Sequence, residues 1–434
     1  MVKEKILIVS DSWGAPTGFS NNGGNIAWML ADKYDVHGLG LQTFQDHKME
    51  LVNHGEKRTV FQHANQPRTQ DRWDFGQRSL PRLLDELEPE ILLTVNDIQM
   101  VQHVPDTMCG NKIKLQVMDL PSKKFLSDEA MRIQLQGELQ KFKEKFPRTT
   151  KWIQYAPQDG HPPMPQWGSI YKMADQMVAF SKYGQWVFKE WFGMEVPRIS
   201  HGVDTDTFKP MEKPKELQDK FVIGNINRNQ PRKQPVRSMM AFAKFAKDKP
   251  DVLLHMQMDW NDEFGWPIQY FGELYGIMNK MIPPARVGMP TPEVVKIYNM
   301  WDLSLNATGG DGFCIPVIES FACGVPTIGV PYTTFQELII DGEPTPRGSL
   351  AKIKDLHWQK MDVAAVMRSL VDVDDLANVM NKYYYDRDKI KTEGKNGREW
   401  VEKKCSLKIL QHQWKDLIGK VLAGEKVSNL EIKE

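Results

Sequence analysis

Residues 309–326 read GGDGFCIPVIESFACGVP and form the stretch that decides the fold. A glycine-rich loop leads into a short apolar segment in which Pro316 fits the first position of a helix and Gly324 the position just past its end. Apolar runs typical of buried strands flank the stretch, and it carries two carboxylates, Asp311 and Glu319, eight positions apart. The sequence therefore predicts a strand–loop–helix unit, with Asp311 in the loop and Glu319 on the first turn of the helix.

Such a unit can bind two kinds of chemical group. The backbone N–H groups of Cys314, Ile315 and Val317 are expected to be free at the helix N-terminus, where a phosphate can dock. A carboxylate accepts hydrogen bonds from two neighbouring hydroxyls, so Asp311 and Glu319 can each hold one sugar. A nucleotide sugar offers both a diphosphate and two sugars. The alternative is that Glu319 only complements the helix dipole and Asp311 only shapes a turn.

The rest of the chain repeats this architecture. Short β-branched runs alternate with longer amphipathic segments, which predicts parallel sheets with helices on both faces. The pattern restarts after a charged stretch near residue 215. We therefore expect an α/β fold of two facing, doubly wound, Rossmann-like domains, residues 1–213 and 214–406, with a ligand cleft between them. A helix over residues 407–425 is expected to pack back on the first domain.

The predicted elements are as follows. Strands are expected at residues 5–10, 36–41, 90–95, 112–118, 151–156, 176–180, 221–225, 252–257, 303–306 and 327–330. Helices are expected at residues 25–34, 79–87, 128–146, 183–192, 236–247, 292–300 and 395–422.

Composition narrows the class of protein. A chain of 434 residues exceeds what one core supports, which favours two domains. Lys and Arg together number 56, as do Asp and Glu, and this neutral balance argues against a polyanion as the main ligand. The four cysteines lack metal-site spacing, and neither a signal peptide nor a membrane-spanning run is recognisable. We expect a cytoplasmic protein.

A basic loop follows the strand expected at residues 221–225. Arg228, Arg232 and Lys233 lie within six residues, at a junction where the dipole of the next helix disfavours cations. A bound anion, most simply a diphosphate, explains this clustering. A solvated basic loop is the alternative. Another glycine-rich loop, at residues 11–24, is interpreted equally well as a ligand loop or a plain turn.

Other polar groups were weighed against structural roles. Asp159 and His161 lie in a kinked loop after a strand, and a lone histidine such as His161 is more often structural. Residues 372–374 and 386–388 have the DxD form of a metal–diphosphate site, but their charged helical surroundings favour solvated faces. We therefore predict no metal site.

Four blocks in order resemble the retaining GT-B glycosyltransferases of the family-4 type, the glycosyl transferases group 1. The blocks are residues 174–181, the segment HGVDTDTFKP at 201–210, the pair Arg228 and Lys233, and residues 311–326. The resemblance covers about residues 1–425. It implies a nucleoside-diphosphate sugar as donor, UDP- or GDP-linked, held mainly by the second domain, and transferase activity of the EC 2.4 class that requires no cofactor or metal.

The resemblance also implies roles for single residues. Arg228 and Lys233 would neutralise the diphosphate, and Glu319 would bind the ribose hydroxyls. Asp311 would hold the transferred sugar together with backbone amides. The residues implied for the remaining contacts are Gly312, Phe313, Cys314 and Ile315 beside the sugar, Gly18 and Phe19 closing on the donor from the first domain, and Asp159, with Asp119 second, as the acid of that domain.

Two positions depart from the family pattern. Asp311 replaces a glutamate, and Cys314 replaces a glycine next to the sugar. A non-catalytic nucleotide-sugar binder therefore stays open as an alternative, as do a phosphorylase or epimerase of the same fold. The acceptor stays open among a saccharide, a lipid-linked sugar, a small molecule and, less favoured by the neutral charge, a modified base in nucleic acid.

Overall fold

The computed structural model describes residues 3–65, 74–108, 149–286, 288–341, 345–361 and 364–430. The chain divides into two compact units. Unit 1 comprises Met1–Pro157, Pro162–Ser200 and Leu410–Glu434, and unit 2 comprises Gln158–His161 and His201–Ile409. The strand expected at 112–118, the helix expected at 128–146 and the candidate Asp119 lie outside the described residues.

Unit 1 is built on a sheet with the strand order β3-β4-β2-β1-β5-β6-β7. All neighbours pair in parallel except β3 and β4, which are antiparallel. The strands are β1 (Lys5–Ser10), β2 (Asp35–Gly40), β3 (His47–Asn53), β4 (Glu56–Ala64), β5 (Ile91–Val95), β6 (Lys151–Ala156) and β7 (Gln176–Ala179). The antiparallel pair β3–β4 is absent from the sequence-based prediction.

The helices of unit 1 include one that begins earlier than predicted. Helix α1 spans Gly18–Leu30, not 25–34, because Thr17 caps it: the Thr17 hydroxyl accepts a hydrogen bond from the Ser20 N–H at 3.1 Å. The glycines at 23 and 24 therefore lie inside the helix rather than in a loop. The other helices are α2 (Ser79–Leu87), α3 (Ile98–Val101), α4 (Val104–Met108), α6 (Trp167–Met173) and α7 (Lys182–Phe192).

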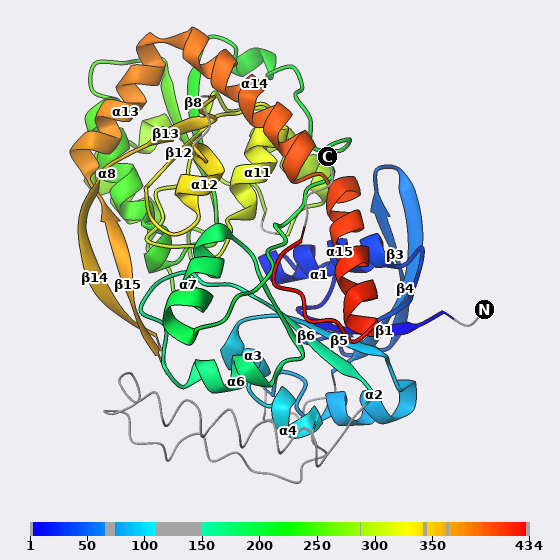
Figure 1. The fold of residues 1–434 in the computed structure, drawn as a ribbon. Coiled ribbons are helices and arrows are strands. Elements are labelled where there is room, and N and C mark those ends of the chain that lie inside the picture. The colour runs from blue at the N-terminus through cyan, green and yellow to red at the C-terminus, as the bar shows by residue number, and fades with distance from the viewer. Residues whose placement is uncertain are drawn as a thin grey trace. The chain divides into compact units, whose positions relative to one another are not determined.

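Unit 2 is built on a second parallel sheet, ordered β10-β9-β8-β11-β12-β13. Its strands are β8 (Phe221–Ile226), β9 (Val252–Gln257), β10 (Met281–Ile282), β11 (Leu303–Leu305), β12 (Thr327–Gly329) and β13 (Gly348–Leu350). The predicted α/β class with parallel sheets is thus confirmed. A separate antiparallel hairpin, β14 (Ile353–Met361) and β15 (Ala364–Val371), was not predicted (Figure 1).

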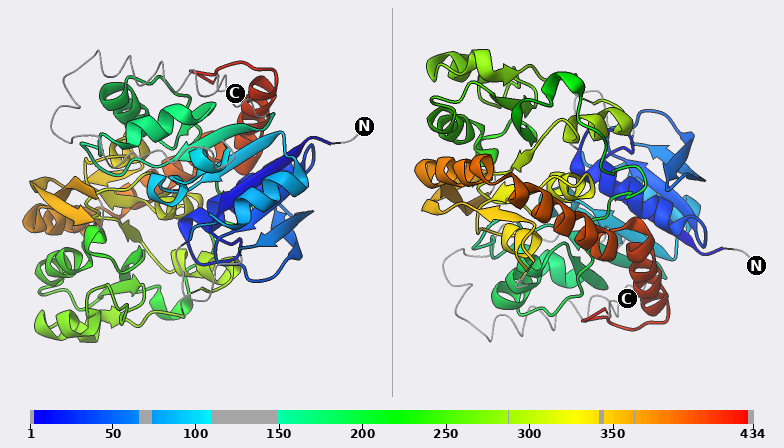
Figure 2. Two further views of the ribbon diagram at one scale, coloured as in Figure 1. Left: turned by 90° about the horizontal axis from the view of Figure 1, so that it is seen from below. Right: turned by 90° about the horizontal axis from the view of Figure 1, so that it is seen from above.

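Helices cover the sheet of unit 2. Helices α8 and α13 lie side by side (Figures 1 and 2), and their apolar side chains share one core with the central strands. Helix α14 packs against α11. The helices are α8 (Pro235–Phe245), α9 (Ile268–Leu274), α10 (Thr291–Tyr298), α11 (Ile315–Ala322), α12 (Phe335–Ile339), α13 (Val373–Tyr385) and α14 (Arg387–Lys404), with 3-10 turns at η2 (Lys215–Leu217), η3 (Pro231–Lys233) and η4 (Met278–Lys280).

The helix expected at 395–422 is two helices. Helix α14 ends at Lys404 and α15 spans Leu407–Leu422. Between them the chain pairs with Val203, whose N–H donates to the Cys405 carbonyl at 2.9 Å. No helix in the described part of the chain combines the length and hydrophobicity needed to cross a membrane.

Helix α15 packs into the core of unit 1 through Trp414. The Trp414 side chain is buried and meets the Tyr155 ring edge-on at 5.0 Å between centroids. Trp414→Ala should lower the free energy of unfolding by about 3–5 kcal/mol, because it removes a large buried aromatic and leaves a cavity. Urea denaturation measures this. The exposed neighbour in His412→Ala serves as control and should change stability by less than about 0.5 kcal/mol; equal effects would contradict the packing role of Trp414.

Candidate functional site

Two loops of unit 2 meet because β8 and β11 are neighbouring parallel strands. The loop after β8 carries Arg232 and Lys233, and the loop after β11 carries Asp311. The Lys233 Nζ donates to both Asp311 carboxylate oxygens at 2.8 Å. The Arg232 Nη1 donates to Asp311 Oδ1 at 2.5 Å and to the Gly310 carbonyl at 3.0 Å. We name Arg232, Lys233 and Asp311 the charge cluster.

The charge cluster carries a net positive charge. Burial alone would raise the pKa of Asp311, but Lys233 and Arg232 outweigh it and bring the pKa to about 2. Asp311 is therefore ionised at neutral pH, and one carboxylate faces two cations. The Lys233 side chain is only 9% exposed, so the surplus charge sits where water screens it poorly. Such a place favours a further anion.

Arg228 lies apart from this cluster. Its side chain is 64% exposed, and its Nε lies 3.5 Å from Asp262 Oδ2. The structure brings Arg232, not Arg228, to Lys233 and Asp311. Both arginines were visible in the sequence as part of the basic loop, but the family resemblance implied a role only for Arg228.

The loop after β11 leads into helix α11. Asp311 is held there by its backbone N–H, which donates to Thr333 Oγ1 at 3.1 Å. Pro316 occupies the second helical position rather than the first, and Glu319 lies on the second turn rather than the first. The predicted position of Pro316 was wrong by one residue and that of Glu319 by one turn, because the helix begins at Ile315.

The N–H groups at this helix end divide into two sets. The Val317 N–H, expected to be free, donates to the Cys314 carbonyl at 3.1 Å, so that prediction was wrong. The N–H groups of residues 312–315 have no hydrogen-bond partner among the residues that the structure describes. Together with the helix dipole they offer unsatisfied donors close in sequence to Asp311, a suitable place for an anion.

The Glu319 carboxylate is hydrogen-bonded within unit 2. The Tyr298 hydroxyl donates to Glu319 Oε2 at 2.7 Å. Burial raises the pKa of Glu319 to about 7, although the hydrogen bond from Tyr298 opposes part of the rise. Glu319 thus titrates near neutral pH. Tyr298 was not predicted, since no local pattern links it to a residue 21 positions away.

The remaining candidates lie on different elements. Gly18 and Phe19 begin helix α1 in unit 1. Asp159 belongs to unit 2, where its Oδ2 lies 3.0 Å from the Arg368 Nη2 on β15. Phe313 is buried, and its ring lies 4.8 Å from the ring of His201. Arg368 was missed because its hairpin was missed.

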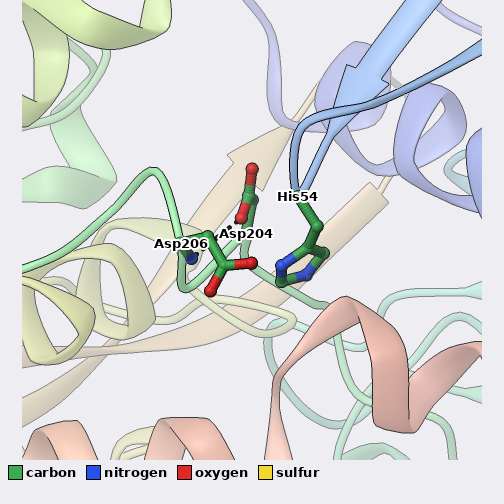
Figure 3. A group of neighbouring side chains, drawn as sticks. All are labelled: His54, Asp204 and Asp206. Carbon is green, nitrogen blue, oxygen red and sulfur yellow. Dashed lines mark hydrogen bonds between the residues drawn. The ribbon is translucent and has the colours of Figure 1, made fainter.

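The acidic stretches have structural partners. Asp372 caps α13 by accepting from the backbone N–H groups of Asp374 and Asp375, and Asp386 caps α14 by accepting from that of Lys389. Figure 3 shows Asp204 and Asp206 next to one another, and Asp204 Oδ1 accepts from the Asp206 N–H at 2.9 Å. The histidine drawn with them, His54, belongs to unit 1, so the three do not define a metal site within either unit.

Comparison with known proteins finds a family model that matches part of the chain. Residues 206–387 match the family model of the glycosyl transferases group 1. The matched segment lies in unit 2 and includes the charge cluster and Glu319. No curated protein sequence matches significantly.

Solved structures resemble the chain over almost its whole length. Sucrose-phosphate synthase from Thermosynechococcus elongatus has a TM-score of 0.71 at 14% identity, covering 98% of this chain and 100% of that chain. HepE from Anabaena, in complex with UDP and glucose, has a TM-score of 0.64 at 15% identity, covering 96% and 100%. A glycosyltransferase from Rickettsia africae has a TM-score of 0.60 at 12% identity, covering 97% and 99%.

These likenesses confirm the predicted fold class. The chain has the α/β fold of the GT-B glycosyltransferases, with two Rossmann-like domains. The family match itself is confined to residues 206–387.

The left-handed backbone conformation of Cys314 is expected to lower the stability of the protein. Its φ is 75°, a left-handed value that a side chain disfavours and glycine adopts freely. Cys314→Gly removes the strain, whereas Cys314→Ala keeps it and still loses the buried sulfur. We expect Cys314→Gly to be more stable than Cys314→Ala by about 1 kcal/mol in urea denaturation.

A matched pair tests the cause. Cys323, also buried, has a φ of −83°, so there the glycine variant should be the less stable by about 1 kcal/mol. The same order at both cysteines would contradict the strain at Cys314.

The raised pKa of Glu319 makes stability depend on pH. The folded pKa, about 7, exceeds the ordinary value of 4.5, so protonated Glu319 favours the folded state. This contribution is complete below about pH 4.5 and is lost as the pH rises through 7. Glu319→Gln stays neutral, so it should gain stability relative to the wild type by about 1–3 kcal/mol between pH 5 and 8. Denaturant unfolding across this range measures the gain; the exposed control Glu293→Gln should show none, and a flat difference for Glu319→Gln would refute the shift.

Proposed function

We propose that the chain is a glycosyltransferase that moves a sugar from a nucleoside-diphosphate sugar to an acceptor hydroxyl, with retention of anomeric configuration and without a metal ion. The charge cluster carries this proposal. Two poorly exposed cations share one carboxylate, and close to it in sequence are N–H groups of a helix N-terminus that have no partner among the described residues. A diphosphate satisfies both features, and the family match over residues 206–387 supports the same reading.

The diphosphate is proposed to bind at Lys233 and Arg232. Lys233 has three N–H donors, and two of them point to Asp311. An arriving diphosphate takes the third donor and the surplus positive charge. Because the cations are already fixed by Asp311, they need little reorganisation when negative charge develops on the leaving group. Arg228, exposed on the same loop, is proposed to reach the diphosphate from solvent.

Two carboxylates are proposed to hold the two sugars of the donor. Glu319 accepts from the ribose hydroxyls, with Tyr298 fixing one of its oxygens. Asp311 holds the transferred sugar, assisted by the N–H groups of residues 312–315. Asp311 is one methylene shorter than the family's glutamate, and Cys314 adds a side chain where the family has glycine, so these two positions are proposed to set the donor sugar.

The proposed transfer proceeds on one face of the sugar. The bond between the anomeric carbon and the diphosphate oxygen breaks while the acceptor oxygen bonds to the anomeric carbon from the same side. The acceptor proton passes to a departing diphosphate oxygen, which balances the charge and requires no carboxylate nucleophile. This differs from the two-carboxylate scheme of glycosidases. Lys233, Arg232 and the helix N–H groups stabilise the departing diphosphate.

The proposal extends to the whole chain. Residues 214–406 are proposed to bind the donor, and residues 1–213 the acceptor, with Gly18 and Phe19 contributing from helix α1. HepE from Anabaena is solved with UDP-glucose, so UDP-glucose is the first donor to test, followed by GDP-linked sugars. The acceptor is proposed to be a saccharide, a lipid-linked sugar or a small molecule, in the cytoplasm.

A donor panel tests the binding half of the proposal. Purified protein is heated with UDP-, GDP- or ADP-linked sugars, and the matching donor should raise the melting temperature, because it binds only the folded state. A ligand at one hundred times its Kd adds about 2.7 kcal/mol of stability. No shift with any nucleotide sugar would count against the site.

Variants test the residues. With the donor so found, Lys233→Ala and Glu319→Ala should each lower kcat/KM for donor hydrolysis or transfer by about 10²–10³, because each removes a contact to the donor. Lys244→Ala, an exposed lysine on α8, is the control and should keep wild-type turnover. Retained turnover in both site variants would contradict the assignment of Lys233 and Glu319 to donor binding. Donor binding by calorimetry without product, across many acceptors, would favour a non-catalytic nucleotide-sugar binder.

A further inference from the structure

Arg368 carries a buried charge and belongs neither to the charge cluster nor to the residues proposed to bind the donor. Its side chain is 0% exposed on strand β15. An isolated guanidinium at such a place would cost several kcal/mol, so its partners define why it is there. Arg368 Nη2 donates to Asp159 Oδ2 at 3.0 Å, Nη1 donates to the Asp159 carbonyl, and Nε donates to Gln359 Oε1 at 3.3 Å.

The arginine fixes one side of the Asp159 carboxylate. Asp159 remains 33% exposed although its partner is completely buried. The guanidinium holds both the carbonyl and Oδ2, which sets the backbone and the side chain of this residue at once. The second oxygen, Oδ1, has no hydrogen bond to any residue that the structure describes. One oxygen is therefore clamped and the other is available to a ligand.

The same guanidinium lies against the loop that carries Asp311. Gly310 has a φ of 152°, and a Cβ added there would lie 2.2 Å from the Asp159 carbonyl oxygen and 2.8 Å from Arg368 Nη1. Only glycine allows this approach. Because Gly310 directly precedes Asp311 and its carbonyl accepts from Arg232, Arg368 joins the Asp159 loop to the charge cluster.

The backbone of β15 adds three further contacts to the same loops. The Met367 N–H donates to the His161 carbonyl at 3.1 Å, and the Ser369 N–H donates to the Gly309 carbonyl at 3.1 Å. The Gln234 Nε2, one residue after Lys233, donates to the Ser369 carbonyl at 2.8 Å. Strand β15 therefore connects all three loops that hold the candidate residues of unit 2.

We propose that Arg368 is a positioning residue: it aims the open oxygen of Asp159 at the sugar held beside Asp311. The inference rests on the proposed transfer of a sugar. The proposal gives the β14–β15 hairpin a role in the transfer step and not in diphosphate binding. Among the described residues, Arg368 contacts neither Lys233 nor Glu319.

Steady-state kinetics separate these two steps. Arg368→Lys keeps the charge but loses the forked contact to Asp159. It should lower kcat about 10- to 100-fold while the donor Kd from calorimetry stays within about twofold, because a misplaced group affects the transition state more than donor binding. Arg237→Lys is the matched control, since Arg237 also donates to a β15 carbonyl, that of Val371, without a contact to Asp159. Its kcat should be unchanged.

A double-variant cycle tests whether Arg368 acts through Asp159. Asp159→Asn should lower kcat, and adding Arg368→Lys should cause no further loss, because the two changes remove one function. Independent, multiplicative losses would overturn the proposal, as would an unchanged kcat in Arg368→Lys. A parallel loss of kcat and donor affinity would assign Arg368 a merely structural role and would also overturn it.

Hydrogen exchange keeps the inference distinct from the proposed function. In Arg368→Lys, amide exchange should accelerate in residues 158–161 and 309–312, and Arg237→Lys should leave both segments as in the wild type. Absent acceleration overturns the positioning role whether or not the wild type transfers sugar. A wild type without turnover on any donor would defeat the proposed function, and the exchange result would still decide whether Arg368 holds the two loops together.

Discussion

The sharing of one carboxylate by two cations is the interaction on which the site of unit 2 depends. Asp311 neutralises only part of the charge of Lys233 and Arg232, and all three lie where water is scarce. The carboxylate makes it possible to keep the cations in place before a ligand arrives. The surplus charge then makes the same place attractive to an anion. One ion cluster thus combines rigidity with affinity, and removing Asp311 would release the two cations from their fixed positions.

The sheet topology explains why these groups meet. Adjacent parallel strands β8 and β11 end at the same edge, so Lys233 and Asp311, which are 78 residues apart in the chain, come together in the loops that follow. Short apolar runs between amphipathic segments predicted both strands from the sequence. The elements β1, α2, β6 and β9 have the predicted bounds. Local pattern was sufficient there because burial on both sides imposes continuous apolar runs on parallel strands.

Other features depended on contacts that no local pattern encodes. Arg232, rather than Arg228, contacts Asp311: Arg232 shares the 3-10 turn Pro231–Lys233 with Lys233, whereas Arg228 lies before that turn. The β14 strand was overlooked because most of it is exposed and mixes charged with apolar residues. The early start of α1 was overlooked because glycine and asparagine are weak helix formers, and the Thr17 cap compensates for them. In each case a tertiary or capping interaction determined the local structure, which the secondary-structure propensities of the residues did not specify.

The chain also crosses between its units more often than its two-domain pattern suggests. Residues 158–161 belong to unit 2, although the segments on both sides of them belong to unit 1. A fragment of residues 201–409 would therefore contain the charge cluster but lack Asp159, and Arg368 would become a buried cation without its carboxylate. Unit 2 is consequently not a module that can be removed or exchanged at a single point of the chain. Any chimera that keeps it intact must carry the short segment 158–161 with it.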